Sequence, residues 1–267
     1  MRTALTIAGS DPGGGAGIQA DLKTFAAFGV YGASVVAAVT VQNTLGVDRV
    51  APLEADLVTA QIESIAGDLT VHATKTGMLA TAAIVEAVTA AIDELDLPLV
   101  VVDPVLMSAS GVPLLDADGV RALSAELLPR ARVVTPNVPE AEALSGRRIQ
   151  SLDDARDAAR RIHDLGPRAV VITGGHAQAR RGAAEAEVVD LLLEDDEFQE
   201  FRVVRVDAGA THGTGCTFAS AVAAGLALGR TLADAVERAQ LYVAGALEHR
   251  IVVGRGRAVL DHFWERR

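Results

Sequence analysis

The sequence predicts an α/β protein with a largely parallel central sheet, and three observations carry this prediction. Short apolar runs alternate along the chain with longer segments in which apolar residues recur every three or four positions. Half of the 267 residues are apolar, so the chain can bury a sizeable core. No linker rich in Pro, Ser or Gly interrupts the alternation, and no internal repeat is visible. Alternating strands and helices build sheets covered by helices, so we expect one three-layer domain over residues 1–267.

The predicted strands are short, continuous apolar runs, which is the pattern of strands buried on both faces. They are Ala4–Ala8, Ser34–Val41, Leu99–Val102, Arg132–Val134, Ala169–Ile172 and Val188–Leu193. Near the last of these, Gly182–Asp196 and Phe198–Val206 are expected to form two strands joined by an acidic turn, as an antiparallel edge.

The predicted helices are the segments with a helical apolar period. Ala82–Leu95 is the clearest, since its apolar residues fall on one face of a helix. The full set is Ile18–Phe28, Ala55–Ala66, Ala82–Leu95, Asp116–Leu127, Pro139–Leu144, Ser151–Leu165, Gly215–Leu228 and Leu232–His249.

Composition excludes several classes of partner. The formal net charge is −11, so a polyanion such as nucleic acid would be repelled, and no basic block suits anionic lipid. The longest apolar stretch, Cys216–Gly229, is too short for the ~20 residues that span a bilayer. The N-terminal apolar run, Thr3–Gly9, is shorter than the core of a signal peptide. We therefore expect a cytoplasmic protein that binds neither membrane nor nucleic acid.

Nearly all of the basic residues are arginine: of the 24, only Lys23 and Lys75 are lysine. A mutational bias towards arginine codons explains most of this. A lysine kept in such a chain also indicates a position where a compact ammonium group is needed.

Two of the strand ends carry residues that suit a ligand, because ligands bind outside the carboxyl ends of strands in open α/β sheets. Gly9–Gly17 follows the first strand and matches neither the Rossmann nor the P-loop pattern. It is either a flexible turn or a place where backbone approaches a ligand closely. Asp103 ends another strand, where its carboxylate can meet a metal or a metal-bound water, or can simply occupy a turn before Pro104.

Two helix starts complete the candidate site. Asn137 and Glu140 either face one side of a helix or form its capping box. In Thr211–Thr217, two glycines precede a helix whose free N–H groups favour an anion. Cys216 lies in that first turn, where we expect a lowered thiol pKa. From the residues alone, we expect an α/β protein with an anion hole, suited to phosphoryl transfer.

Eight segments, in their order and spacing, form a recognisable set. They are Ala4–Asp11, Gly14–Phe25, Val41–Val47, Lys75–Leu79, Val102–Val105, Thr135–Asn137 with Glu140-Ala141, Gly174–His176 and His212–Thr217. Together they resemble the hydroxymethylpyrimidine/phosphomethylpyrimidine kinases of thiamine synthesis, over the chain as far as about Gly254.

The resemblance implies a ribokinase-like α/β/α sandwich that uses ATP and Mg²⁺. It implies two successive phosphorylations, of a pyrimidine alcohol and of its monophosphate, in a protein we expect to be a homodimer. The resemblance also implies a role for each matching position.

In the substrate pocket, Asp11, Gln42 and Met78 would line the site of the pyrimidine. Asp103 and Glu140 would organise Mg²⁺ through waters, and Asn137 and Thr173 would contact the nucleotide. The anion hole would be formed by Gly213, Thr214 and Gly215, and Cys216 would be the base.

The chain departs from the family pattern in three places, and two alternatives to this function remain open. Ala109 and Thr173 stand where the family often has lysine, and Gly254–Ala258 replaces a Gly-His-Gly-Pro pattern. The two lost cations motivate a protein that binds pyrimidine and nucleotide without turnover. A pyridoxal or pyridoxine kinase is the alternative within the same class of enzyme.

Overall fold

The computed structural model describes residues 1–108, 111–175, 187–209 and 211–266. Their strands are β1 (Thr3–Ser10), β2 (Tyr31–Gln42), β3 (Val47–Pro52), β4 (Ala73–Thr76), β5 (Val100–Val102), β6 (Val133–Val134), β7 (Ala169–Gly175), β8 (Glu187–Glu194), β9 (Glu197–Val204), β10 (Thr211–His212) and β11 (Ala258–Val259). The helices are α1 (Gly17–Ala27), α2 (Ala55–Ala66), α3 (Ala82–Glu94), α4 (Ala117–Ala122), α5 (Val138–Ser145), α6 (Leu152–His163), α7 (Thr214–Ala227) and α8 (Leu232–Glu248).

The described strands form a nine-stranded sheet in the order β3-β2-β1-β4-β5-β6-β7-β8-β9, and β10 pairs with β11 separately. The strands from β2 to β7 in this order pair in parallel. Strand β3 is antiparallel at one edge, and β8 and β9 are antiparallel at the other. The largely parallel sheet and the antiparallel edge around the acidic turn are therefore confirmed.

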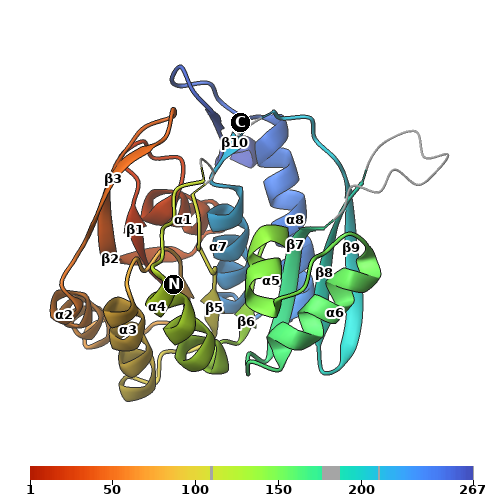
Figure 1. Cartoon of the computed structure of the whole chain (residues 1–267). Helices are drawn as coiled ribbons and strands as arrows, with labels where there is room; N and C mark the ends of the chain where they lie inside the picture. Colours follow the sequence, from red (N-terminus) through yellow and green to blue (C-terminus); the bar gives the residue numbers. More distant parts are fainter. Residues whose placement is uncertain (109–110, 176–186, 210, 267) are drawn as a thin grey trace.

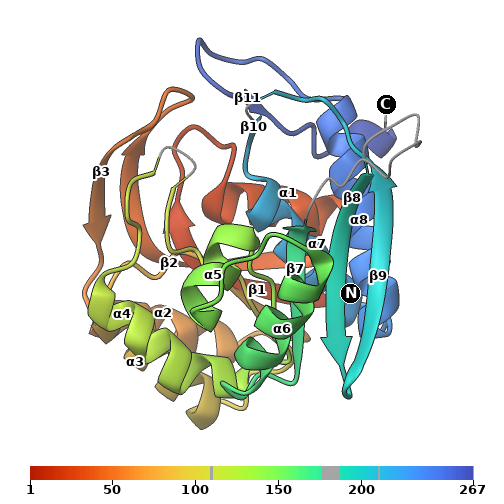
Figure 2. The same cartoon turned by 45° about the vertical axis from the view of Figure 1, so that its right-hand side comes forward.

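Helices cover both faces of the sheet, which confirms the three-layer prediction (Figures 1 and 2). Helices α2 to α6 pack on one face, and α1, α7 and α8 pack on the other. Side chains alternate along β5, so Val100 and Val102 enter the first core while Val101 enters the second. The described part of the chain contains no helix long and apolar enough to cross a bilayer.

The structure corrects several element predictions. Strands β3, β4, β10 and β11 were not expected. Strand β4 lies in the middle of the sheet, yet its sequence is Ala-Thr-Lys-Thr, and polar residues at that position break the apolar pattern of a buried strand. The helix expected over Asp116–Leu127 is α-helical only to Ala122 and continues as a π-helical turn, Leu123–Leu127. The strand expected from Gly182 is described only from Glu187.

The pair β10–β11 brings the C-terminal part of the chain beside the N-terminus of α7. Strand β10 leads directly into α7, and it pairs in parallel with β11, which lies more than forty residues further along the chain (Figure 2). Beside β11, Gly256 donates its N–H to Thr44 Oγ1, and Arg257 donates its N–H to the carbonyl of Thr44. The Gly254–Ala258 segment therefore closes over the loop that follows β2.

Candidate active site

A cavity of about 490 Å³ opens at the carboxyl ends of the parallel strands. This is where an open α/β sheet places its ligands. Every residue that the sequence assigns to the site lines this one cavity. These residues are Asp11, Gln42, Met78, Asp103, Asn137, Glu140, Thr173, Gly213, Thr214, Gly215 and Cys216.

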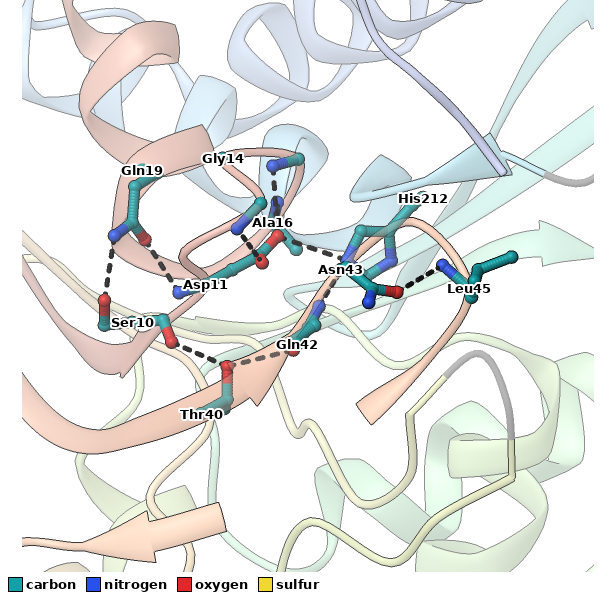
Figure 3. Close-up of polar contacts among 12 residues, drawn as sticks. Ser10, Asp11, Gly14, Ala16, Gln19, Thr40, Gln42, Asn43, Leu45 and His212 are labelled. Atoms are coloured by element: carbon teal, nitrogen blue, oxygen red, sulfur yellow. Dashed lines mark hydrogen bonds and ion pairs between the residues drawn. The ribbon is translucent and has the colours of Figure 1, made fainter. Parts of the chain in front are cut away.

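Asp11 organises the glycine-rich loop after β1 (Figure 3). Its carboxylate accepts hydrogen bonds from the backbone N–H groups of Gly13, Gly15 and Ala16 at 2.8, 3.0 and 2.8 Å. Burial would raise the pKa of Asp11, but hydrogen bonds from His212, Gly13 and Ala16 outweigh it, and the pKa is lowered. Asp11 is therefore an ionised group that shapes the loop.

Gln42, at the end of β2, lines the cavity and is oriented by two side chains (Figure 3). Its amide contacts Thr40 Oγ1 at 3.2 Å and His212 Nε2 at 2.7 Å. His212 Nε2 also lies 3.3 Å from Asp11 Oδ2. The contacts join β2, the loop after β1 and the residue before the α7 N-terminus.

Met78 belongs to an apolar wall of the cavity. Together with Ala38 and Ala80 it forms a small buried cluster, against which Val50, Val105 and Leu114 pack. A β-carbon on Gly9 would lie only 3.1 Å from Met78 Sδ, so a larger residue at that position would displace the thioether. This wall suits the face or methyl substituents of a small ring.

Beneath the cavity lies a buried ammonium group, Lys75 on β4. Its Nζ is 3.0 Å from Asp21 Oδ2 and 3.7 Å from Asp103 Oδ2, and neither the Lys75 nor the Asp21 side chain is exposed. Burial alone would lower the pKa of Lys75, but the negative charges of Asp21 and Asp103 outweigh it and the pKa is raised. Lys75 is thus a fixed positive charge under the cavity floor.

Asp103 and Glu140 place two carboxyl groups in the same buried wall. Burial raises the pKa of both groups; for Glu140 burial and then the charge of Asp103 raise it to about 8. Asp103 Oδ2 is buried and makes no hydrogen bond among the described residues. Two such carboxyl groups fit a hard divalent cation that keeps most of its waters, as Mg²⁺ does. No cluster of three or more ligating side chains was found in the described residues, so these residues alone would not enclose a metal.

Asn137 and Glu140 also form the capping box of α5. The Glu140 N–H donates to Asn137 Oδ1 at 3.0 Å, and the Asn137 N–H donates to Glu140 Oε2 at 2.9 Å. The capping interpretation of this motif is therefore correct. It does not compete with a place at the site, since both residues line the cavity.

The N-terminus of α7 faces the cavity with bare backbone. Its N-cap Gly213 has a φ of 88° and offers no side-chain cap to the first N–H groups. A β-carbon on Gly213 would collide with the carbonyl oxygen of Gly15, whereas one on Gly215 would meet only Asp103 Oδ1, at 3.9 Å. The backbone conformation and the Gly15 carbonyl therefore exclude any other residue at Gly213, whereas the space in front of Gly215 could accommodate a side chain or a ligand.

The expected low thiol pKa at Cys216 is wrong for the ligand-free protein. Burial is the largest influence and, with the charges of Asp103 and Asp21, raises the pKa of Cys216 to about 12. Lys75 acts in the opposite direction but does not compensate. The helix N-terminus was the only influence visible in the sequence; the desolvation and the two buried carboxylates come from the tertiary structure.

Thr173, at the end of β7, holds the Asn137 segment in place. Its N–H donates to the carbonyl of Pro136 at 2.9 Å, and it forms a parallel bridge with Asn137. Ala109 and His176, which the sequence also singled out, lie outside the described residues.

Among the residues at or under the cavity that were given no role from the sequence, four make polar contacts that organise the site. Thr40, Lys75 and His212 line the cavity, and Asp21 anchors Lys75. Lys75 carried a signal, because it is one of only two lysines in the chain. The other three lie beside their partners only after folding.

The comparisons with known proteins agree with this geometry. The family model described as phosphomethylpyrimidine kinase matches residues 11–261. The hydroxymethylpyrimidine/phosphomethylpyrimidine kinase of Bacillus subtilis is 44% identical over 97% of this chain and 94% of its own, and that of Streptomyces coelicolor is 45% identical over the same shares.

Solved structures show the same fold. A phosphomethylpyrimidine kinase from Clostridium difficile has a TM-score of 0.79 at 38% identity, covering 91% of this chain and 98% of its own. The ADP complex of Bacillus subtilis pyridoxal kinase has a TM-score of 0.88 at 36% identity, covering 100% and 99%. The fold is therefore ribokinase-like, as the sequence predicts, and the chain belongs to the phosphomethylpyrimidine kinase family.

Proposed function

We propose that the protein transfers the γ-phosphoryl group of ATP to 4-amino-5-hydroxymethyl-2-methylpyrimidine, and then to the resulting monophosphate. One observation carries the proposal: the bare N-terminus of α7 shares a cavity with the Asp103 carboxylate, and among the described residues a β-carbon on Gly215 would approach only Asp103 Oδ1, at 3.9 Å. A helix N-terminus attracts phosphate, and phosphoryl transfer depends on such positioned charge. The curated relatives named for this activity support the choice of substrate.

We assign the ring of the substrate to the part of the cavity between Met78 and Gln42. The apolar cluster around Met78 offers a surface for the ring, and the Gln42 amide offers a polar edge. A substrate held there would have its hydroxymethyl group directed towards α7, because that helix starts beyond Gln42 and His212.

We assign the nucleotide phosphates to the α7 N-terminus, with Asn137 and Thr173, which line the same cavity, as further contacts. Pyridoxal kinase of Staphylococcus aureus has been solved with ADP at 35% identity to this chain, which supports ATP as the donor. Asp103 and Glu140 would hold Mg²⁺ through water, and the ion would supply positive charge to the phosphates.

The chemistry needs a place for the hydroxyl proton. The Cys216 thiol is protonated at neutral pH in the ligand-free protein, because burial raises its pKa to about 12. Phosphoryl transfer passes through a loose transition state, in which the attacking hydroxyl needs little activation. We therefore assign most of the catalysis to positioned charge, from the α7 N-terminus and Lys75. A thiol that keeps its proton cannot accept another, so Cys216 would receive the hydroxyl proton late in the reaction only after releasing its own to solvent. A cation beside Asp103 would favour that release, because it would offset one of the charges that raise the thiol pKa.

A second candidate is a pyridoxal kinase, because pyridoxal kinases are among the solved structures that match with TM-scores up to 0.89. The deciding assay measures phosphate transfer from ATP·Mg²⁺ to hydroxymethylpyrimidine, to its monophosphate and to pyridoxal. We expect kcat/KM to be highest for the pyrimidines. A higher value for pyridoxal would reverse the assignment, and binding of all three without turnover would indicate a binding protein.

We also propose that the chain is a single cytoplasmic domain that forms a homodimer. One nine-stranded sheet takes its strands from Thr3 to Val204, and the later helices α7 and α8 pack on it, which supports one domain. Val39, Val41 and Leu45 are 47, 54 and 61% exposed near the β3 edge, and such an apolar edge suits a second copy. Sedimentation equilibrium tests this: a parent dimer that becomes a monomer in Val41→Lys supports it, and a monomeric parent contradicts it.

A further inference from the structure

His212 connects three parts of the site through one nitrogen atom. It ends β10 and directly precedes Gly213, the N-cap of α7. Its Nε2 lies 2.7 Å from the Gln42 amide and 3.3 Å from Asp11 Oδ2 (Figure 3). Its ring also packs closely, since a β-carbon on Gly15 would come within 3.1 Å of His212 Cδ2. The side chain is only 20% exposed, so its polar contacts are largely shielded from water.

Counting protons shows which end of the Gln42 amide faces His212. Thr40 Oγ1 has a single proton and lies 2.9 Å from the carbonyl oxygen of Ser10, which can only accept. The structure places Gln42 Oε1 3.2 Å from Thr40 Oγ1, so two acceptors compete for this proton and the Ser10 carbonyl is the nearer. With the proton on Ser10, Thr40 Oγ1 can only accept from Gln42. The group of Gln42 beside Thr40 is then its NH2. A half-turn of the amide, which leaves its shape unchanged, places its carbonyl oxygen beside His212.

Asp11 leads independently to the same arrangement. Its Oδ2 is a pure acceptor in its ionised form, so the His212 nitrogen 3.3 Å away should carry a proton. A bare Nε2 would instead direct a lone pair at the carboxylate. With the proton on Nε2, His212 donates to the oxygens of Gln42 and Asp11 together, so both acceptors face a donor.

We propose that His212 is a positioning residue that determines specificity: its Nε2–H holds the Gln42 amide with the carbonyl oxygen towards His212 and the NH2 towards Thr40. An amide held at both ends cannot turn over to meet a ring edge of opposite polarity without breaking both contacts. His212 therefore selects which edge of a heterocyclic ring the cavity accepts. The identity of that ring, a pyrimidine, rests on the proposed function; the orientation of the amide does not.

The first test needs no substrate. In a ¹H–¹⁵N multiple-bond correlation spectrum of the ligand-free protein at pH 8.5, the His212 ring should show a protonated Nε2. The chain has six histidines, so the signal lost in His212→Gln identifies the ring. A ring protonated only at Nδ1 would overturn the proposal, whatever the enzyme phosphorylates.

The second test measures discrimination. The ratio of kcat/KM for 5-hydroxymethyl-2-methylpyrimidines bearing a 4-amino or a 4-oxo group compares rings whose edges have opposite polarity. We expect the parent to prefer the 4-amino ring. His212→Phe frees the amide and should reduce that preference about tenfold or more, since a buried hydrogen bond is lost. His212→Gln, which keeps an N–H donor, should restore most of it.

The outcomes separate His212 from the proposed function. His163→Phe on α6, which is outside the residues lining the cavity, is the control and should leave the ratio unchanged. If His212→Phe lowers kcat/KM for both rings equally, His212 is merely structural and the proposal fails. If the parent phosphorylates neither ring, the proposed function fails, while the spectrum still decides the orientation of the Gln42 amide.

Discussion

Lys75 Nζ lies 3.0 Å from Asp21 Oδ2, and both side chains are completely buried. Asp21 also accepts hydrogen bonds from Thr6 Oγ1 at 2.6 Å and from Ser220 Oγ at 2.7 Å. The contacts tie together β1, α1, β4 and α7 at one point beneath the cavity. The buried charges are therefore part of the connection between the sheet and α7, the helix whose N-terminus faces the cavity.

Lys75→Met is expected to destabilise the protein strongly, because it leaves Asp21 and Asp103 buried without their cation. Removing one partner of a buried ion pair costs about 3–5 kcal/mol of the free energy of unfolding. Urea unfolding measures this loss. Lys23→Met is the matched control, since Lys23 is only partly buried and donates to a carbonyl, that of Gly14, rather than to a carboxylate, and it should lose less than about 1.5 kcal/mol. Equal losses from the two variants would show that Asp21 does not need its cation.

Substitution of Gly213 is expected to reduce the stability of the protein, whereas substitution of Gly215 is expected to remove its activity. Gly215→Val should abolish turnover and remove stabilisation by ATP·Mg²⁺ with a near-native Tm, because its side chain enters open space before the helix. Gly213→Ala should lower the Tm, since its φ of 88° and the Gly15 carbonyl both reject a β-carbon. Gly229→Ala is a control for φ alone, because Gly229 has φ 82° but no neighbour within 4 Å. A destabilised but active Gly215→Val would contradict the anion-site assignment.

Cys216→Ser is expected to keep the fold and the binding of both substrates while reducing kcat. The loss of a group that handles a proton in the transition state is worth roughly 10²–10⁴-fold. Steady-state kinetics gives kcat and KM, and thermal melting checks the fold. A kcat equal to that of the parent would remove Cys216 from the chemistry.

Glu140 should make the ligand-free protein less stable as the pH rises. Its pKa is raised from 4.5 to about 8 by burial and by Asp103. Between these values the folded protein holds a proton that the unfolded chain has lost, so its stabilising effect is complete below pH 4.5 and disappears as the pH passes through 8. Glu140→Gln keeps the capping box and should flatten the dependence of Tm on pH between 5 and 9. An unchanged slope would place the titrating group elsewhere.

Asp103→Asn is expected to increase the concentration of Mg²⁺ that activity requires. Loss of one carboxylate weakens the bound ion, so part of the activity should return as Mg²⁺ is raised. Kinetics across a Mg²⁺ series measures this, and Asp93→Asn, which removes an exposed carboxylate that pairs with Arg130, is the control. A defect of the same size at every Mg²⁺ concentration would leave Asp103 with only a structural role.

The alternating pattern of apolar runs and helical periods was sufficient to predict the architecture. Parallel strands that are buried on both faces, such as Val100–Val102, must be apolar throughout, and this is visible in the sequence. Helix α2 was predicted residue for residue, since Ala55–Ala66 has a regular apolar period. The glycines, Asp103 and Asn137 could be chosen because they stand where strands end and helices begin, and such positions are defined by local sequence. Asp11, Gln42 and Met78 were instead assigned through the family resemblance.

What the sequence could not provide depends on contacts between distant segments. Strand β4 was missed because Lys75 is buried through Asp21, fifty-four residues away in the chain, so its polarity gave no sign of burial. The Cys216 pKa was predicted with the wrong direction, because the influences that dominate it, desolvation and two buried carboxylates, come from other elements. His212 and Gln42 are separated by 170 positions. The sequence by itself determined which groups are present at the site; only the tertiary structure decided their charges and their orientation, because both depend on what each group is buried against.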